Sequence, residues 1–205
     1  MSYLPFILAA IVLAITPGPG IAYVVARTAA GGRPEGLASC FGTGIGGLIH
    51  VLAAALGLSL FLAKSALAFS VVKYVGAAYL IYLGVRMLTR EQPPAGVRSV
   101  SSRGARHALF EGVLVEALNV KTALFFLAFL PQFATPGAPL IPQLVLLGSV
   151  CVTLNTLADI TAVLLANRLL KSSVGRATRA RLLTRVSGMT MLGLGTYLAV
   201  ARRAV

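Results

Sequence analysis

Six apolar segments, each about 20 residues long or longer, follow one another along this chain and leave little sequence between them. The segments are residues 4–26, 37–63, 66–88, 108–130, 140–166 and 182–201. An α-helix needs about 20 mainly apolar residues to cross the hydrocarbon core of a bilayer. Charged residues make up 11% of the chain, against roughly 25% in an ordinary soluble domain. The chain is therefore predicted to be an all-α integral membrane protein with six transmembrane helices.

The positive charge of the chain is concentrated in alternate loops. Lys and Arg number 18 against 5 Asp and Glu, and most of them follow the first, third and fifth segments, whereas residues 131–139 carry no charge. Because basic loops remain cytoplasmic, both termini are predicted to lie outside. Topology and attraction to anionic lipid account for the charge, so the expected partner is the lipid bilayer and not nucleic acid.

The polar segment 91–107 divides the predicted membrane domain, which covers residues 1–205, into repeat one (1–90) and repeat two (108–205). Each repeat holds three spans, and an odd number forces the second repeat to enter the membrane from the opposite side. Lys73 and Arg185 are each followed by Gly three residues later and by Leu four residues after that Gly. Chance similarity between glycine-rich helices is the alternative. Two inverted three-helix repeats around a central site favour a transport function.

The first helix of each repeat is predicted to be interrupted. Thr16-Pro17-Gly18-Pro19-Gly20 places two prolines in the first span, and proline removes an amide donor and disrupts the preceding turn. The matching span contains Asn119-Val120-Lys121. Broken backbone at membrane depth survives where it is buried or lines a wet cavity, although a packing kink is an alternative. The predicted substrate-binding and translocation residues are Pro17, Gly18, Pro19, Gly20, Glu116, Asn119 and Lys121.

Three ionisable residues inside the apolar segments are candidates for proton coupling: Glu116, Asp159 and His50. A charged side chain at the centre of a span costs about 2.5–3.5 kcal/mol, so such residues are functional by default. Histidine changes its charge near physiological pH. The alternatives are an ion pair between Glu116 and Lys121, and a core histidine whose hydrogen bonds are satisfied.

Small residues and cysteines complete the predictions. Glycines expected to allow close helix packing, and to permit a homodimer, are Gly42, Gly46, Gly76, Gly84, Gly188 and Gly195. Cys40 and Cys151 lack a paired motif and are expected in the core, with an intramembrane thiol redox protein as the alternative from another class. No catalytic or metal-binding signature is present. We therefore expect no enzyme activity, no cofactor and no metal.

These motifs resemble the LysE/RhtB family of bacterial amino-acid exporters over nearly the whole chain. The similar pieces are Pro17-Gly18-Pro19 with Arg27 and Arg33, the glycine-rich run ending in His50, residues 73–84, residues 119–133, Asp159, and residues 185–188. The resemblance implies export of amino acids or close derivatives across the bacterial inner (cytoplasmic) membrane. It also implies coupling to the proton motive force and alternating access, with the amino acid and protons as partners.

Two departures from the family pattern bear on the predicted site. The family commonly has Asn-Pro-Lys where this chain has Asn119-Val120-Lys121, so the second break is expected to be shallower. Gly47 stands where relatives usually have Asp. We hypothesise that Glu116 partly replaces this missing carboxylate, and we expect neutral rather than dibasic amino acids. A carrier of another small solute or metal cation, and a structural subunit acting through a partner, are the alternatives.

Overall fold

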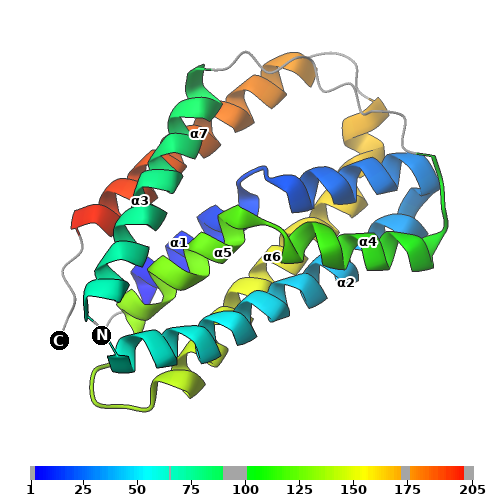
Figure 1. Cartoon of the computed structure of the whole chain (residues 1–205). Coiled ribbons are helices and arrows are strands. Elements are labelled where there is room, and N and C mark those ends of the chain that lie inside the picture. Colours follow the sequence, from blue (N-terminus) through cyan, green and yellow to red (C-terminus); the bar gives the residue numbers. More distant parts are fainter. Residues whose placement is uncertain (1–2, 65, 90–100, 172–175, 201–205) are drawn as a thin grey trace.

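The computed structural model describes residues 3–64, 66–89, 101–171 and 176–200. Within these ranges the chain is helical, and no described residue lies in a β-strand (Figure 1). The elements are α1 Leu4–Ile15, α2 Pro19–Lys64, α3 Ala66–Thr89, α4 Ala105–Ala117, α5 Val120–Phe129, η1 Leu130–Phe133, α6 Leu140–Lys171 and α7 Arg176–Val200. The predicted all-helical fold is confirmed. Residues 91–100 of the predicted linker lie outside the described residues.

The first predicted span is divided by a break between α1 and α2. Thr16 ends α1 in an extended conformation, with φ of −72° and ψ of 117°. A residue before proline is driven away from the helical region, and Pro19 begins α2, where the missing proline N–H costs nothing. The interruption predicted from Pro17 and Pro19 is therefore present. With 12 residues, α1 is too short to cross a bilayer by itself.

The fourth predicted span is also divided, and α4 and α5 are bent by 49° relative to each other. Asn119 is the N-cap of α5, and its side-chain oxygen accepts a hydrogen bond of 3.1 Å from the backbone N–H of Lys121. Such a cap satisfies an N–H that has no partner within the helix. The break therefore persists with Val120 in the place of the family's proline, because the asparagine cap begins a new helix.

Helix α2 is a hairpin of two arms, residues 19–31 and 33–64 (Figure 1). Gly32 joins them with φ of 72° and ψ of −164°, a conformation that glycine adopts at little cost. The sequence analysis placed Arg27 and Arg33 in a loop between the first two spans. That placement is wrong, because both residues are helical and the chain reverses at Gly32 alone.

Glycines allow the helices to approach one another closely. Helix α2 packs on α4 and α6, α3 packs on α7, and α1 packs on α6. A Cβ atom at Gly42 would lie 2.1 Å from the Leu109 carbonyl oxygen of α4, and one at Gly84 would lie 2.7 Å from the Gly188 carbonyl oxygen of α7. Any larger residue would therefore push these helices apart. Phenylalanine rings of α1, α5 and η1 fill the core beside α6.

The described helices carry apolar exteriors. Among the residues that the structure describes, Pro19–Gly57 and Leu140–Leu165 are long and apolar enough to cross a membrane, and the bent pair Ala105–Ala117 and Val120–Phe133 forms a third candidate if counted as one span. Large apolar side chains on the second arm of α2, such as Phe41 and Leu52, are exposed. The arrangement of six spans in two inverted repeats stays a prediction, because the breaks divide two of the expected spans into shorter helices.

Candidate translocation site

The two helix breaks meet in the interior through Lys121, the second residue of α5. Its Nζ donates hydrogen bonds to the carbonyl oxygens of Thr16 (3.0 Å) and Leu13 (3.3 Å) at the end of α1. The last carbonyls of a helix have no partner within the helix, and a cation is stabilised there by the helix dipole. A Cβ atom at Gly18 would lie 3.2 Å from this Nζ. Lys121 therefore serves as a cap for α1.

Glu116, in the last turn of α4, is 2% exposed and is held by two neutral donors. Its Oε2 accepts from Asn119 Nδ2 at 3.0 Å, and its Oε1 accepts from Thr122 Oγ1 at 2.7 Å. A Cβ atom at Gly20 would lie 2.8 Å from Oε2, so the carboxylate sits beside the first turn of α2. Helix N-termini favour such a negative charge. No described residue forms an ion pair with Glu116, so the alternative of a Glu116–Lys121 pair is not observed.

Asp159 reaches the same region from α6, whereas His50 points to a backbone carbonyl. The Oδ2 atom of Asp159 lies 2.9 Å from Thr43 Oγ1 on the second arm of α2. His50 Nε2 lies 2.7 Å from the carbonyl oxygen of Glu116. Because a carbonyl oxygen can only accept, the imidazole Nε2–H donates this bond. This hydrogen bond holds the His50 ring against the backbone of Glu116.

A small cavity lies where these groups converge. The residues that line it are Leu13, Thr43, Gly44, Gly47, Glu116, Thr122, Phe126, Cys151, Val152, Asn155, Thr156 and Asp159. The space open to the centre of a water-sized sphere is about 10 Å³, enough for about one water molecule. Of the predicted site residues, Glu116 and Asp159 line this cavity. Asn119, Lys121, Gly18 and Gly20 lie beside Glu116 or the end of α1, and Pro17 and Pro19 shape the break.

The predicted packing glycines lie at contacts between helices. Gly42 and Gly46 face α4, and Gly76 faces Ala128 of α5. Gly84, Gly188 and Gly195 lie between α3 and α7. These placements agree with a packing role within one chain. Cys40 is buried against Val24 and Val163, and Cys151 lines the cavity on a different face of the core.

Sequence reasoning missed four polar residues of the cavity wall: Thr43, Thr122, Asn155 and Thr156. Threonine is common in apolar helices, and its position in the sequence alone does not say which way it faces. A usable signal existed for Asn155, which precedes Asp159 by one helical turn and must share its face.

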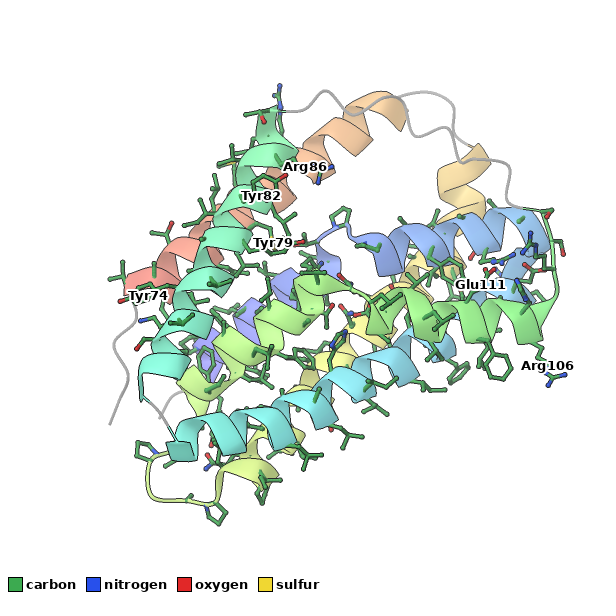
Figure 2. All side chains as sticks on the ribbon, in the orientation of Figure 1. Tyr74, Tyr79, Tyr82, Arg86, Arg106 and Glu111 are labelled. Atoms are coloured by element: carbon green, nitrogen blue, oxygen red, sulfur yellow. The ribbon has the colours of Figure 1, made fainter. Side chains whose placement is uncertain are left out.

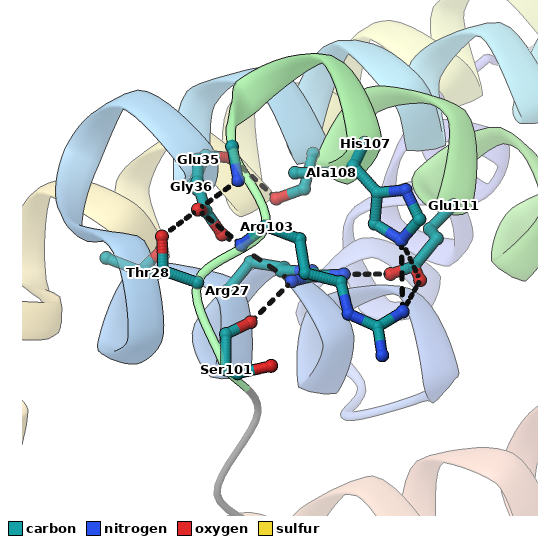
Figure 3. A network of polar contacts seen from close by, with 12 residues as sticks. Arg27, Thr28, Glu35, Gly36, Ser101, Arg103, His107, Ala108 and Glu111 are labelled. Carbon is teal, nitrogen blue, oxygen red and sulfur yellow. Dashed lines mark hydrogen bonds and ion pairs between the residues drawn. The ribbon is translucent and has the colours of Figure 1, made fainter.

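A second polar cluster, the Arg27 network, lies at the other end of α4 (Figure 3). Arg27, on the first arm of α2, is 1% exposed. Its guanidinium donates to the Glu111 carboxylate, donates to the Ser101 carbonyl at 3.2 Å, and lies 3.5 Å from Glu35 Oε2. Tyr23 accepts from Arg27 Nε at 3.2 Å. Figure 2 shows Glu111 between α4 and the first arm of α2, whereas Arg106 points outward.

Glu35 connects this network to the start of α4. Its Oε1 accepts hydrogen bonds from Ser102 Oγ (2.6 Å), Gly104 N (2.7 Å) and Arg103 N (3.1 Å). A carboxylate at a helix N-terminus satisfies free N–H groups and is favoured by the dipole. The sequence analysis assigned no role to Glu35.

Broken helices around a buried polar cavity are typical of carriers among helical membrane proteins. The chain belongs to the LysE type translocator family, whose family model matches residues 11–202. The family resemblance stated from the motifs is thereby confirmed.

Curated relatives match over almost their whole length. The chain is 30% identical to an uncharacterized membrane protein of Vibrio cholerae, covering 98% of this chain and 97% of that protein. It is 29% identical to a homoserine/homoserine lactone efflux protein of Salmonella typhimurium, covering 97% and 96%. An uncharacterized membrane protein of Bacillus subtilis is also 29% identical, with 95% and 96% covered. No solved structure matches the chain.

Proposed function

We propose that this chain exports amino acids or close derivatives, with neutral rather than dibasic side chains, by alternating access. The observation that carries the proposal is the cavity between the two helix breaks, whose wall contains the buried carboxyl groups of Glu116 and Asp159. An ammonium group needs oxygen acceptors in the protein interior, and this wall offers them. The relatives named as homoserine/homoserine lactone efflux proteins support the same class of solute.

Coupling to the proton motive force is part of the proposal. Intramembrane carboxyl groups form the proton relays of pumps and transporters, and the Asp159 carboxyl group accepts a hydrogen bond from Thr43. In the proposed cycle, one of the two acids carries a proton while the other faces the solute. Glu116 takes the place of the acid that relatives have at Gly47, whose own Cβ position faces Val152 of α6.

The proposed setting is the bacterial inner membrane, with two inverted repeats of three spans each and both termini outside. Contacts between corresponding elements support this symmetry, because α3 packs on α7 and the second arm of α2 packs on α6. The site then lies where the first helix of one repeat meets the first helix of the other.

Solute flux out of loaded proteoliposomes tests the proposed function. Vesicles containing the purified chain are loaded with radiolabelled homoserine or alanine, and a pH gradient is imposed in either direction. We expect solute movement that reverses with the gradient and is abolished by a protonophore. The matched variants Glu116→Gln and Asp159→Asn keep the shape of each side chain and should reduce the gradient-driven flux. Solute flux equal to that of loaded vesicles without the protein would refute the export proposal.

A further inference from the structure

Two buried carboxyl groups line the cavity, whereas the neighbouring cation, Lys121, does not line it. Glu116 and Asp159 are 2% and 4% exposed, and the side chains that donate hydrogen bonds to them, Asn119, Thr122 and Thr43, are all neutral. None of the described residues that line the cavity is basic. Buried charges in proteins are normally paired or neutralised. The missing partner of these carboxyl groups is therefore expected to come from the solute or from protons.

The cation nearest to this wall is committed elsewhere. Lys121 follows Asn119 in the chain, but both hydrogen bonds of its Nζ go to the carbonyl oxygens of Leu13 and Thr16. Lys121 is among the residues predicted from the sequence to bind the substrate, and its positive charge would suit a substrate carboxylate. Serving a substrate carboxylate would require Lys121 to leave the end of α1, which would expose carbonyls that have no other donor.

The size of the cavity fits the head of an amine. Its open space holds a group of about the size of one water molecule, and a primary ammonium is of similar size. Three hydrogens of an ammonium need three acceptors, and three of the lining residues, Glu116, Asp159 and Asn155, carry a carboxyl or amide oxygen. A carboxylate attached to the same carbon atom would meet these two acids, and like charges at close range repel.

We infer that this cavity selects primary amines whose adjacent carboxyl group is masked, as in an amide, an ester or a lactone, over the free zwitterion. The inference rests on the proposed export function and narrows its substrate class. A masked solute carries one net positive charge, which complements the cavity, and it leaves Lys121 at the end of α1. An N-acylated solute lacks the ammonium and is excluded.

Binding and flux of three matched probes test this inference: alaninamide, alanine and N-acetylalaninamide. Binding to the purified chain is measured by thermal stabilisation in detergent, and flux is measured in proteoliposomes. We expect alaninamide to bind about tenfold more tightly than alanine, because a site built for one polar group rejects the mismatched analogue. N-acetylalaninamide should not bind. Glu116→Gln and Asp159→Asn should each reduce the preference for alaninamide, whereas Arg106→Gln on the outer face of α4 should not.

The outcomes separate the inference from the proposed function. Equal or tighter binding of alanine, or binding of N-acetylalaninamide, overturns the inference even if export occurs. Preferential binding of alaninamide without flux of any probe supports the inference and refutes export. Loss of all binding in both acid variants could reflect unfolding, so the thermal midpoint of each variant without probe is measured beside the parent. A preference unchanged in folded variants also overturns the inference.

The Arg27 network carries a second, independent inference. It joins residues 23–35 of the first half of the chain to residues 101–111 of the second half. The first arm of α2 and α4 connect this network to the two helix breaks. Arg27 lies 8 residues after Pro19, and Glu111 lies 6 residues before Ala117, which are about 12 Å and about 9 Å at the helical rise. The network and the cavity therefore lie at different levels of the same two half-helices.

We propose that the Arg27 network is a latch that holds the cytoplasmic end of the carrier closed. Arg27 is buried between carboxyl groups from two elements, Glu35 on the second arm of α2 and Glu111 on α4. Separation of α4 from α2 would remove Glu111 from this arginine and leave it with Glu35 and Tyr23, and the loss of one partner is costly for a buried charge. Entry of a solute from the cytoplasm requires that separation, so the network sets how often the end opens.

Labelling of Cys151 tests the latch without any need for transport. This cysteine lines the cavity and is 3% exposed, so a methanethiosulfonate reagent with a fixed positive charge reaches it when the end opens. Cys40→Ala leaves Cys151 as the target thiol. In inside-out vesicles, we expect Cys151 to be labelled about tenfold faster in Glu111→Gln than in the parent, and severalfold faster in Tyr23→Phe. Each variant removes part of a charged hydrogen-bond cluster. Arg106→Gln, an equal change of charge magnitude on the same helix, should label at the parent rate.

Two results would overturn the latch. One is an unchanged labelling rate in Glu111→Gln and Tyr23→Phe. The other is acceleration of the same size in right-side-out vesicles, because general loosening opens both sides whereas a latch opens one. Tyr23→Phe removes a single hydroxyl, and it keeps the test valid if Glu111→Gln fails to fold.

Discussion

At the scale of single residues, the role predicted from the sequence and the role observed in the structure differ most for Lys121. A lysine inside an apolar segment is unusual enough to indicate function, and the sequence placed it among the substrate-binding residues. In the structure its ammonium caps the end of α1 and so stabilises the geometry of the helix break. The acids beside it, Glu116 and Asp159, are the groups that face the cavity.

Lys121→Met tests this structural role. The variant keeps the apolar stem and removes two charged hydrogen bonds, which contribute about 2 kcal/mol together with the cost of the carbonyls left unpaired. We expect a clearly lower midpoint of thermal unfolding in detergent. Arg106→Gln, at an exposed position, should leave the midpoint unchanged. An unchanged midpoint with loss of binding would instead assign Lys121 to the solute.

At the scale of helices, glycine contacts fix the distance between α2 and α4. Gly42 faces Leu109 and Gly112 of α4, and Gly112 in turn lies close to the Ser39 carbonyl oxygen. At this contact the backbones of α2 and α4 are so close that no side chain fits between them. The Arg27 network and Glu116 lie on the same pair of helices, so this spacing sets the geometry of both polar clusters.

Gly42→Ala is expected to destabilise the protein. Its new methyl group would lie 2.1 Å from a backbone oxygen, and overpacking of a tight contact costs about 1–3 kcal/mol. Gly193→Ala, at a site with no atom within 4 Å, is the matched control and should be neutral or slightly stabilising. Thermal unfolding of the two variants side by side distinguishes them. Equal midpoints would show that α2 and α4 can move apart freely.

At the scale of the whole molecule, the distribution of basic residues predicts the orientation in the membrane. Single cysteines at Arg106 and Ala138, in a background of Cys40→Ala and Cys151→Ala, give exposed labels at opposite ends of the second half. We expect an impermeant thiol reagent added to whole cells to modify Ala138→Cys alone, because the basic loops are predicted to be cytoplasmic. Modification of Arg106→Cys alone would reverse the assigned topology.

Apolar segments and prolines predicted the helices and the first break well, because both act through local properties of the chain. Burial of Glu116 and Asp159 within one cavity was within reach, since each interrupts an apolar run. The Arg27 network was not, because its side-chain hydrogen bonds between the two halves of the chain join residues 67 to 88 positions apart and charged residues near a predicted loop are ordinarily solvated. The single-residue turn at Gly32 also required tertiary information, since Pro34 and the charges around it are typical of a longer loop.

The cap on α1 has a consequence for how this protein is made. Lys121 lies 108 residues after Leu13, so the ribosome has completed more than half of the chain before α1 can obtain its donor. During that interval the end of α1 holds unpaired carbonyls, which a lipid environment does not tolerate. The first half must therefore wait in a protected, partly hydrated place, such as the insertion machinery, until α5 emerges. The order of synthesis therefore matters for folding, because Lys121 is made long after the helix that it caps.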